Sequence, residues 1–259
     1  MLIYSLLLPV IIELPAASYR FSTTVTVVRT DSELVVLDTG FPDAKLEKEL
    51  RRIGLDPLDV TLVANTHFHV DHFGGNRLFK NARILLSREE HDYQLQWHRS
   101  YLAAEDREAF VRASFPRLGR REAVKLVGFL DVVKERYFRE EYFGDLGQAV
   151  FVEDEPVLPG WLQVMKTPGH TPHHLSYVLD GRESAAIVTG DIIAGRNAYM
   201  NGKMNFIEVY TDYGSAQSSI ARLKKRAGQW PRTIICPSHE LPFYAADGVR
   251  VDSRPFEIV

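Results

Sequence analysis

The segment N-T-H-F-H-V-D-H-F-G-G-N, residues 65–76, constrains the fold of this 259-residue chain more than any other feature. It places His67, His69, Asp71 and His72 close together, directly after an apolar, β-like run. Side chains two residues apart in an extended segment point the same way, so two of these groups can face one metal ion and two another. Imidazole and carboxylate groups are poor core material but good metal ligands. The fold must therefore bring further ligands to this place.

A second interpretation is that these polar side chains lie on the surface, with Asp71 capping a helix that begins near H-F-G-G-N. That interpretation would suit one isolated histidine. It does not explain three histidines and a carboxylate at such close spacing, whereas a metal site does. Gly74 and Gly75 also favour a site, because glycine lets the backbone approach bound groups closely.

Three further polar residues follow apolar, β-like runs elsewhere in the chain. His170 lies in T-P-G-H-T, Asp191 in V-T-G-D and His239 in P-S-H-E. Taken singly, Asp191 could cap a turn and His239 could be a surface residue. Scaffolds commonly present functional side chains from the loops that follow their strands, at one shared edge. We therefore expect these three side chains to meet the first four.

Strand-like and helical segments alternate along the chain and predict a layered α/β (α+β) fold. Valine- and threonine-rich runs predict two strands within residues 23–38, and L-E-K-E-L-R-R-I predicts a helix that ends at Gly54. Residues from about 89 to 150 are charge-rich and helical in period, so they predict a helical insertion. We expect one domain, residues 1–259, that contains this insertion.

The apolar amino terminus, M-L-I-Y-S-L-L-L-P-V-I-I-E-L-P-A-A, predicts opening strands and neither a signal peptide nor a membrane span. No basic residue precedes the apolar run, Glu13 interrupts it, and it is too short to cross a bilayer. Pro9 and Pro15 suit strand edges and turns. The single cysteine, Cys236, excludes an internal disulfide and fits a reducing compartment. We therefore expect a cytoplasmic protein that does not bind membranes.

Charge argues against nucleic acid as a partner. The net charge is −3 and the pI is near 6.3, whereas nucleic-acid-binding domains concentrate positive charge. Hydrophobic residues make up 45% of the chain, an ordinary share that allows a substantial core. The expected partner is a small-molecule substrate.

The order of the motifs resembles that of the metallo-β-lactamase superfamily. T-H-F-H-V-D-H is followed by T-P-G-H-T, T-G-D and P-S-H-E, and it is preceded by V-V-L-D-T-G, which contains Asp38. The ordered set is far more specific than any one motif, and it extends from residue 38 to residue 239. The resemblance implies a four-layer αββα sandwich with a binuclear metal site at one edge of its two sheets.

The resemblance also implies which side chains hold the two divalent metal ions. The first ion would be bound by His67, His69 and His170. The second ion would be bound by Asp71, His72 and His239. Asp191 would bridge the two ions, and Asp38 would hold the ligand loop in place. Ligands of this kind, without thiolate, favour zinc (Zn) and are compatible with iron (Fe), manganese (Mn), cobalt (Co) or nickel (Ni).

The remaining histidines are expected to have lesser roles. His174 matches a histidine that often follows the third motif and is expected to be structural. His173 stands where many relatives have glycine, so we expect a surface position, or one at the rim of the site. His91 and His98 lie in the helical insertion and are expected to be solvated. Cys236 is expected to be a small buried hydrophobe.

The implied reaction is hydrolysis of an ester-type bond by a hydroxide bound between the two ions, which lower the pKa of a shared water. Asp71 and Asp191 would be the catalytic carboxylates, with Asp71 relaying a proton. The segment that begins at His67 is most similar to quorum-quenching lactonases, so a lactone is the favoured substrate. Those enzymes usually carry a tyrosine three residues after the bridging aspartate. Here that position is Ala194, and the tyrosines that could substitute are Tyr199, Tyr210 and Tyr213.

Two other activities of the superfamily stay open. Glyoxalase II, a thioester hydrolase, shares the ligand set, but its glutathione-binding helical domain follows the last histidine, and only about twenty residues follow His239 here. Persulfide dioxygenases keep many of the same residues, bind a single iron and oxidise their substrate. The metal content would separate oxidation from hydrolysis.

The predicted insertion is rich in aromatic residues: Tyr93, Trp97, Tyr101, Phe110, Phe115, Phe129, Tyr137, Phe138, Tyr142 and Phe143. They could roof a hydrophobic substrate pocket, form the face of a homodimer, or anchor the helices onto the sandwich. We expect the insertion to lie over the site as a lid.

Overall fold

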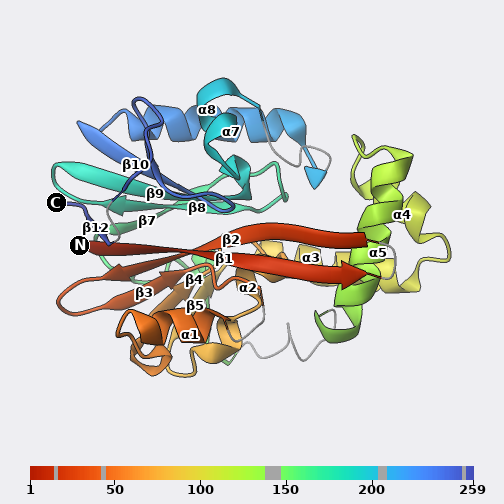
Figure 1. Cartoon of the computed structure of the whole chain (residues 1–259), viewed down its shortest axis with the longest axis horizontal. Helices are drawn as coiled ribbons and strands as arrows, with labels where there is room; N and C mark the ends of the chain where they lie inside the picture. Colours follow the sequence, from red (N-terminus) through yellow and green to blue (C-terminus); the bar gives the residue numbers. More distant parts are fainter. Residues whose placement is uncertain (15–16, 42–44, 138–146, 204–208, 253–254) are drawn as a thin grey trace.

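Two β-sheets pack face to face at the centre of the protein, as a computed structural model shows (Figure 1). The structure describes residues 1–14, 17–41, 45–137, 147–203, 209–252 and 255–259. The first sheet has the order β12 (Phe256–Glu257), β1 (Leu2–Leu14), β2 (Ala17–Arg29), β3 (Leu34–Leu37), β4 (Leu62–Ala64), β5 (Arg83–Leu86) and β6 (Ala149–Phe151). The second has the order β11 (Phe243–Tyr244), β10 (Arg232–Pro237), β9 (Ser184–Gly190), β8 (Leu175–Asp180) and β7 (Leu162–Lys166).

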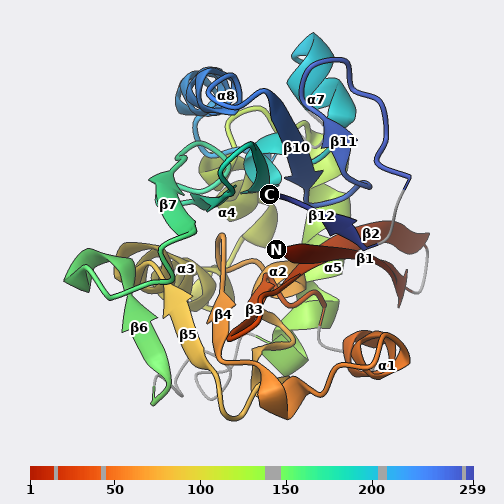
Figure 2. The same cartoon turned by 90° about the vertical axis from the view of Figure 1, so that its left-hand side faces the viewer.

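Helices cover the outer face of each sheet and complete four layers (Figures 1 and 2). The first sheet is covered by α1 (Lys45–Arg52), which buries Leu46 and Leu50. The second is covered by α7 (Arg196–Asn201) and α8 (Tyr213–Ala227). The predicted αββα sandwich is therefore confirmed.

Strand β3 shows why its sequence becomes a central strand. All four residues of L-V-V-L are buried, and successive side chains point to opposite faces of a sheet. Val35 and Leu37 pack between the two sheets, whereas Val36 packs on the outer side with α1. A strand buried on both faces has no polar alternation, which explains the continuous apolar run.

The apolar amino terminus forms a long hairpin, as predicted. Strands β1 and β2 pair from Leu2 with Arg29 to Leu14 with Ala17. Within the described residues, β12 pairs with β1 only at Leu2 and Ile3, so the rest of β1 is an edge. An edge strand tolerates Pro9, because its missing N–H would have had no ladder partner there. The far end of the hairpin buries Val10 and Ile12 against the insertion.

Among the described residues, the interval between β5 and β6 contains three helices: α3 (Arg88–Ala103), α4 (Arg107–Ser114) and α5 (Arg120–Tyr137). They form the predicted insertion. In Figure 1, α4 and α5 lie at the end of the molecule opposite the chain termini. The predicted interval was about 89–150; α3 begins at Arg88 and β6 begins at Ala149. Three of the aromatic residues assigned to the insertion, Phe138, Tyr142 and Phe143, lie outside the described residues.

Asp131 on α5 holds the three helices of the insertion together. Its Oδ1 accepts hydrogen bonds from Tyr101 of α3 at 2.9 Å and from Arg107 of α4 at 2.8 Å. Lys134 donates to the same oxygen. These hydrogen bonds tie the three helices to one another.

Among the described residues, no helix combines the length and apolar character that a bilayer crossing requires.

Candidate metal centre

Four loops bring the predicted ligands to one edge of the sandwich. His67 and His69 follow β4 in an extended loop, and the short helix α2 (Val70–Phe73) then carries the next two candidates. His170 lies between β7 and β8, and Asp191 and His239 follow β9 and β10, which run parallel. Two groups could hold a metal ion, each with its ligand atoms within 4.8 Å of one another. The first group is His67, His69, His170 and Asp191. The second group is Asp71, His72 and His239.

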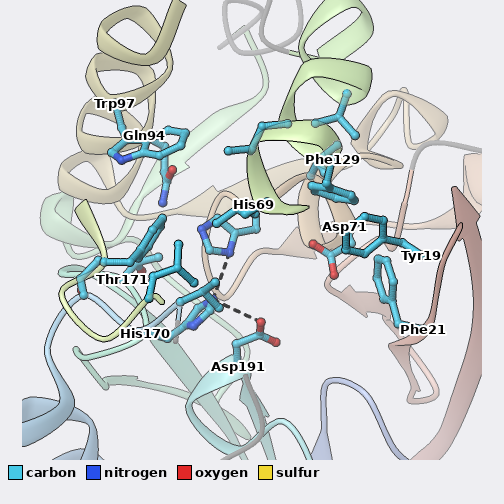
Figure 3. A pocket seen from close by; sticks show the side chains of 18 of the residues that line it. Tyr19, Phe21, His69, Asp71, Gln94, Trp97, Phe129, His170, Thr171 and Asp191 are labelled. Atoms are coloured by element: carbon cyan, nitrogen blue, oxygen red, sulfur yellow. Dashed lines mark hydrogen bonds and ion pairs between the residues drawn. The ribbon is translucent and has the colours of Figure 1, made fainter. Parts of the chain in front are cut away.

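Asp191 joins the two groups. Its Oδ2 lies 3.2 Å from Nε2 of His170, while its Oδ1 lies 3.2 Å from Nε2 of His72 and 3.1 Å from Nε2 of His239. Figure 3 shows His69, His170 and Asp191 converging at the base of a pocket. One carboxylate is thus shared by the first and second groups, as a bridging position requires.

Gly190 allows Asp191 to take this position. Its φ of 55° lies in the left-handed region, and a Cβ there would meet Nε2 of His174 at 2.5 Å. His174 is fully buried, and its Nε2 accepts a hydrogen bond from the backbone N–H of Asp191 at 3.1 Å. The structural role predicted for His174 is confirmed.

Asp38 holds the loop after β4, as predicted. Its carboxylate accepts hydrogen bonds from the backbone N–H and the hydroxyl of Thr66, both at 2.8 Å. Its Oδ2 also lies 2.8 Å from Nδ1 of His72. A proton on that Nδ1 leaves Nε2 of His72 free to face Asp191 or a metal ion. Asp38 has a φ of 55°, a conformation that Asp tolerates better than most residues.

The N-terminal hairpin supports the second group through contacts that sequence analysis missed. The backbone carbonyl of Ser22 lies 2.6 Å from Nδ1 of His239. The Thr23 hydroxyl donates to the carbonyl of Asp71 at 2.9 Å, and the Thr24 N–H donates to the carbonyl of Ser238 at 2.6 Å. Most of these contacts use backbone atoms, so the side chains of β2 carried no signal of them.

The donor chemistry of the first group suits a metal ion. Among the described residues, Nε2 of His67 is buried and has no hydrogen-bond partner. Nδ1 of His69 and Nε2 of His170 lie 3.0 Å apart, although two imidazole nitrogens must share a proton or a cation to be stable there. Buried imidazole and carboxylate donors without thiolate are the usual ligands of catalytic zinc sites.

Charges around the two groups differ. Burial lowers the pKa values of His67, His69 and His170, so the three imidazoles of the first group are neutral and ready to bind a metal ion. Burial also acts to lower the pKa values of His72 and His239, but nearby carboxylates, Asp191 first, outweigh it and raise them.

Asp191 is ionised. Burial alone would raise the pKa of its carboxyl, but the imidazoles of His239, His72 and His170 hold it well below the usual range. A bridging carboxylate has to be charged to bind two cations, so its environment suits the proposed position.

A cavity of about 400 Å³ opens above the two groups (Figure 3). Its floor includes His69, Asp71, His170, Asp191 and His239. Its roof comes mainly from the insertion, with Tyr93, Gln94, Trp97 and His98 on α3 and Leu126, Phe129, Leu130 and Val133 on α5. The hairpin closes one side, where the ring of Tyr19 lies 5.2 Å from that of Phe129. The insertion thus covers the site, as a lid would.

The prediction that His91 and His98 are solvated is wrong. Both are buried, with 5% and 6% exposure, and His98 lines the cavity. Helix α3 turns a polar face inward toward the site, so helical period and charge alone mislead here. Burial lowers the pKa of His98 to about 3. His173 is half-exposed beside Glu89, and Cys236 is buried, both as predicted.

The three tyrosines proposed to replace the missing tyrosine at Ala194 have other contacts. Tyr210 is buried, and its hydroxyl donates to the backbone carbonyl of Asp191. Tyr199 packs against Phe243, and Tyr213 lies under the guanidinium of Arg117. Among the described residues, the tyrosines that line the cavity are Tyr19 and Tyr93.

Comparisons with known proteins agree with this architecture. The chain is 23% identical over 223 residues to an N-acyl homoserine lactonase from a Bacillus species, covering 76% of this chain and 73% of the relative. It superposes on a structure of a quorum-quenching N-acyl homoserine lactone lactonase with a TM-score of 0.63 and 19% identity, covering 98% of both chains. A structure of AidC, a dizinc quorum-quenching lactonase in complex with a product N-hexanoyl-L-homoserine, superposes with a TM-score of 0.61 and 18% identity, covering 93% of this chain and 82% of AidC.

A match to a protein-family model identifies the family of the chain. Residues 18–239, from the hairpin to the last candidate ligand, match the metallo-β-lactamase superfamily. Membership and the lactonase relatives indicate a metal-dependent hydrolase. The chain belongs to the metallo-β-lactamase superfamily.

Proposed function

We propose that this metal-dependent hydrolase opens a lactone ring and that it uses two divalent metal ions, with zinc favoured. The observation that carries the proposal is the shared position of Asp191 between two adjoining groups of buried ligands. A dizinc lactonase among the structural neighbours supports both the number and the kind of ions.

Each group would hold one ion. His67, His69 and His170 would bind the first, Asp71, His72 and His239 the second, and Asp191 would bind both. Bound ions of this kind supply an activated water at neutral pH and polarise a carbonyl group. The side chain of Asp71 is 15% exposed and lines the cavity, with Oδ2 3.6 Å from Nε2 of His72. From there it can accept a proton from the attacking water and return it to the leaving oxygen.

The apolar lining of the cavity favours a substrate that carries an acyl chain. The wall formed by Leu126, Phe129, Leu130 and Val133 is apolar, and the metal groups lie at its base. A substrate with a polar ring and an apolar tail would place its ring at the two groups of candidate metal ligands and its tail under α5. The lactonase relatives act on N-acyl homoserine lactones by name, so we propose lactones of this class as the first substrates to test.

The test is metal content together with a substrate panel. Protein purified without added metal should contain two zinc ions per chain and should open N-acyl homoserine lactones faster than it cleaves thioesters. Faster cleavage of thioesters would favour the glyoxalase II-like alternative. One iron per chain, with oxygen uptake on a thiol persulfide, would instead favour a persulfide dioxygenase.

We also propose that the chain forms one domain, with α3, α4 and α5 inserted into it, and that it functions in the cytoplasm. The single cysteine is buried in the core, which suits a reducing compartment.

Val124 and Val132 are exposed on α5 and would suit a homodimer contact. Size-exclusion chromatography with light scattering would test the dimer.

A further inference from the structure

Glu90 of α3 is a buried carboxylate that the proposed reaction does not use. It is 1% exposed. It lies three residues after Ser87, whose hydroxyl caps the helix by accepting from the Glu90 N–H at 3.1 Å. In a capping box, the glutamate at this position reaches back to the N–H of the capping residue. Here the Glu90 carboxylate instead contacts the two loops that carry the first group of candidate ligands.

The carboxylate bridges those two loops. Oε1 of Glu90 accepts hydrogen bonds from the backbone N–H of Phe68 at 3.4 Å and from Nε2 of Gln94 at 3.2 Å. Oε2 accepts from the backbone N–H of His173 at 3.3 Å. Figure 3 shows Gln94 and Thr171 beside His69 and His170, on the side of the site that faces α3.

Both ends of the bridge lie beside ligands of the first group. Phe68 lies between His67 and His69, and His173 lies three residues after His170. The hydrogen bonds therefore set the distance between the segment that carries His67 and His69 and the segment that carries His170. The second group has other supports, namely Asp38 and the backbone of β2.

Burying the carboxylate of Glu90 costs free energy, and a role in capping α3 would not explain that cost. Burial raises the pKa of the Glu90 carboxyl, and the hydrogen bonds from the two loops oppose the rise. A helix cap could be made by an exposed glutamate at lower cost. Groups that orient metal ligands, by contrast, are regularly buried and hydrogen-bonded.

We infer that Glu90 is a positioning residue that holds the two loops of the first group at the spacing a metal ion needs. The inference rests on the proposed metal role of that group. Its consequence is selective: loss of the bridge weakens one of the two metal sites and leaves the other intact.

The test compares Glu90→Gln with Glu89→Gln. Glutamine keeps the volume but has one acceptor oxygen, so it cannot accept from both loops. Glu89 is the matched control: it is half-exposed on the same helix, and its Oε2 lies 3.2 Å from the side chain of His173 and 3.8 Å from Nζ of Lys166. The probe is zinc, titrated into metal-free protein in competition with a chromophoric chelator, alongside thermal unfolding of the metal-free forms.

Wild type and Glu89→Gln should bind two zinc ions with the same affinities. Glu90→Gln should bind one of them roughly 10- to 100-fold more weakly, as is typical when a group that orients a ligand is removed. Two ions bound by Glu90→Gln as tightly as by wild type would overturn the inference and leave the proposed function standing. A wild type that binds no zinc would overturn both.

A structural role would look different. It would lower the unfolding temperature of the metal-free protein and leave both zinc affinities of the folded fraction unchanged, which would also overturn the inference. If Glu90→Gln does not fold, Glu90→Asp is the second variant. It keeps the charge but is one methylene shorter, so it should fail to span the loops and should weaken the same single site.

Discussion

The two groups of candidate ligands differ in what holds them. The first group faces the insertion, and α3 reaches its loops through Glu90. The second group faces the N-terminal hairpin, and Ser22, Thr23 and Asp38 hold it. Each group is therefore supported by a different element, the first by α3 and the second by the N-terminal hairpin.

The histidines of the two groups also differ in their pKa values, because their surroundings differ. The first group lies deep and has one carboxylate, so its imidazoles have lowered pKa values. The second group contains Asp71 and lies against Asp38, and both carboxylates help to raise the pKa of His72. Changes to the insertion and changes to the hairpin should therefore affect different metal ions, whereas a change to Asp191 should affect both.

The largest effect is expected from Asp191→Ala, which removes the feature that the two groups share. Both metal ions should bind more weakly, and lactone hydrolysis should fall by roughly 10³-fold or more, because metal activation contributes several kcal/mol to the rate. Elemental analysis and initial rates measure the two outcomes. Full metal content with unchanged turnover would contradict the bridging role. Asp154→Ala, at an exposed site, is the control.

Asp38→Asn should weaken the second metal site by roughly 10- to 100-fold, because it removes the charge that orients His72. The first site should weaken less, because Asp38 reaches it only through Thr66. Asparagine tolerates the left-handed backbone at this position, so the backbone should not be strained. Chelator competition measures the affinity. Equal weakening of both sites would show that the two groups are not separately supported.

His98→Phe should change how stability depends on pH on the insertion side. The folded pKa of His98 is about 3, below the ordinary value near 6.5, so the unfolded chain binds a proton that the folded chain does not. Stability is therefore present above about pH 6.5 and falls as the pH drops toward 3.

Between pH 7 and pH 5, wild type should lose about 2 kcal/mol more unfolding free energy than His98→Phe. Urea unfolding of the metal-free protein at the two pH values gives the difference. Parallel pH profiles for wild type and His98→Phe would contradict the prediction.

Phe129→Ala tests the place where the hairpin and the insertion meet. It removes the ring that lies against Tyr19 and lines the cavity, so it should raise KM for long acyl substrates by about tenfold and for short ones by much less. Val132→Ala, on the exposed side of α5, is the control. Equal effects on long and short substrates would count against a lid.

The candidate ligands were predictable because their spacing and residue types are unusual. His67, His69, Asp71 and His72 follow one strand within a short segment, and His170, Asp191 and His239 follow others. Strand ends can be recognised from apolar runs and small residues, so the sequence predicted that these side chains share an edge. The superfamily resemblance then supplied the pairing into two groups.

The supports of the site were not predictable in the same way. His98 and Glu90 belong to a charge-rich helical segment, and its period does not reveal which face turns inward. Ser22 acts through its carbonyl, which every residue has. The lid aromatics could be named, but whether they face the cavity depends on how α5 packs on the hairpin.

The sequence by itself determined which groups can bind metal, the alternation of strands and helices, and the family to which the chain belongs. These depend on residue type and short-range spacing, which the covalent chain carries. Only the tertiary structure decided which loops are held together and which histidines are buried. Those outcomes depend on contacts between residues far apart in the chain and on backbone groups that all residues have in common.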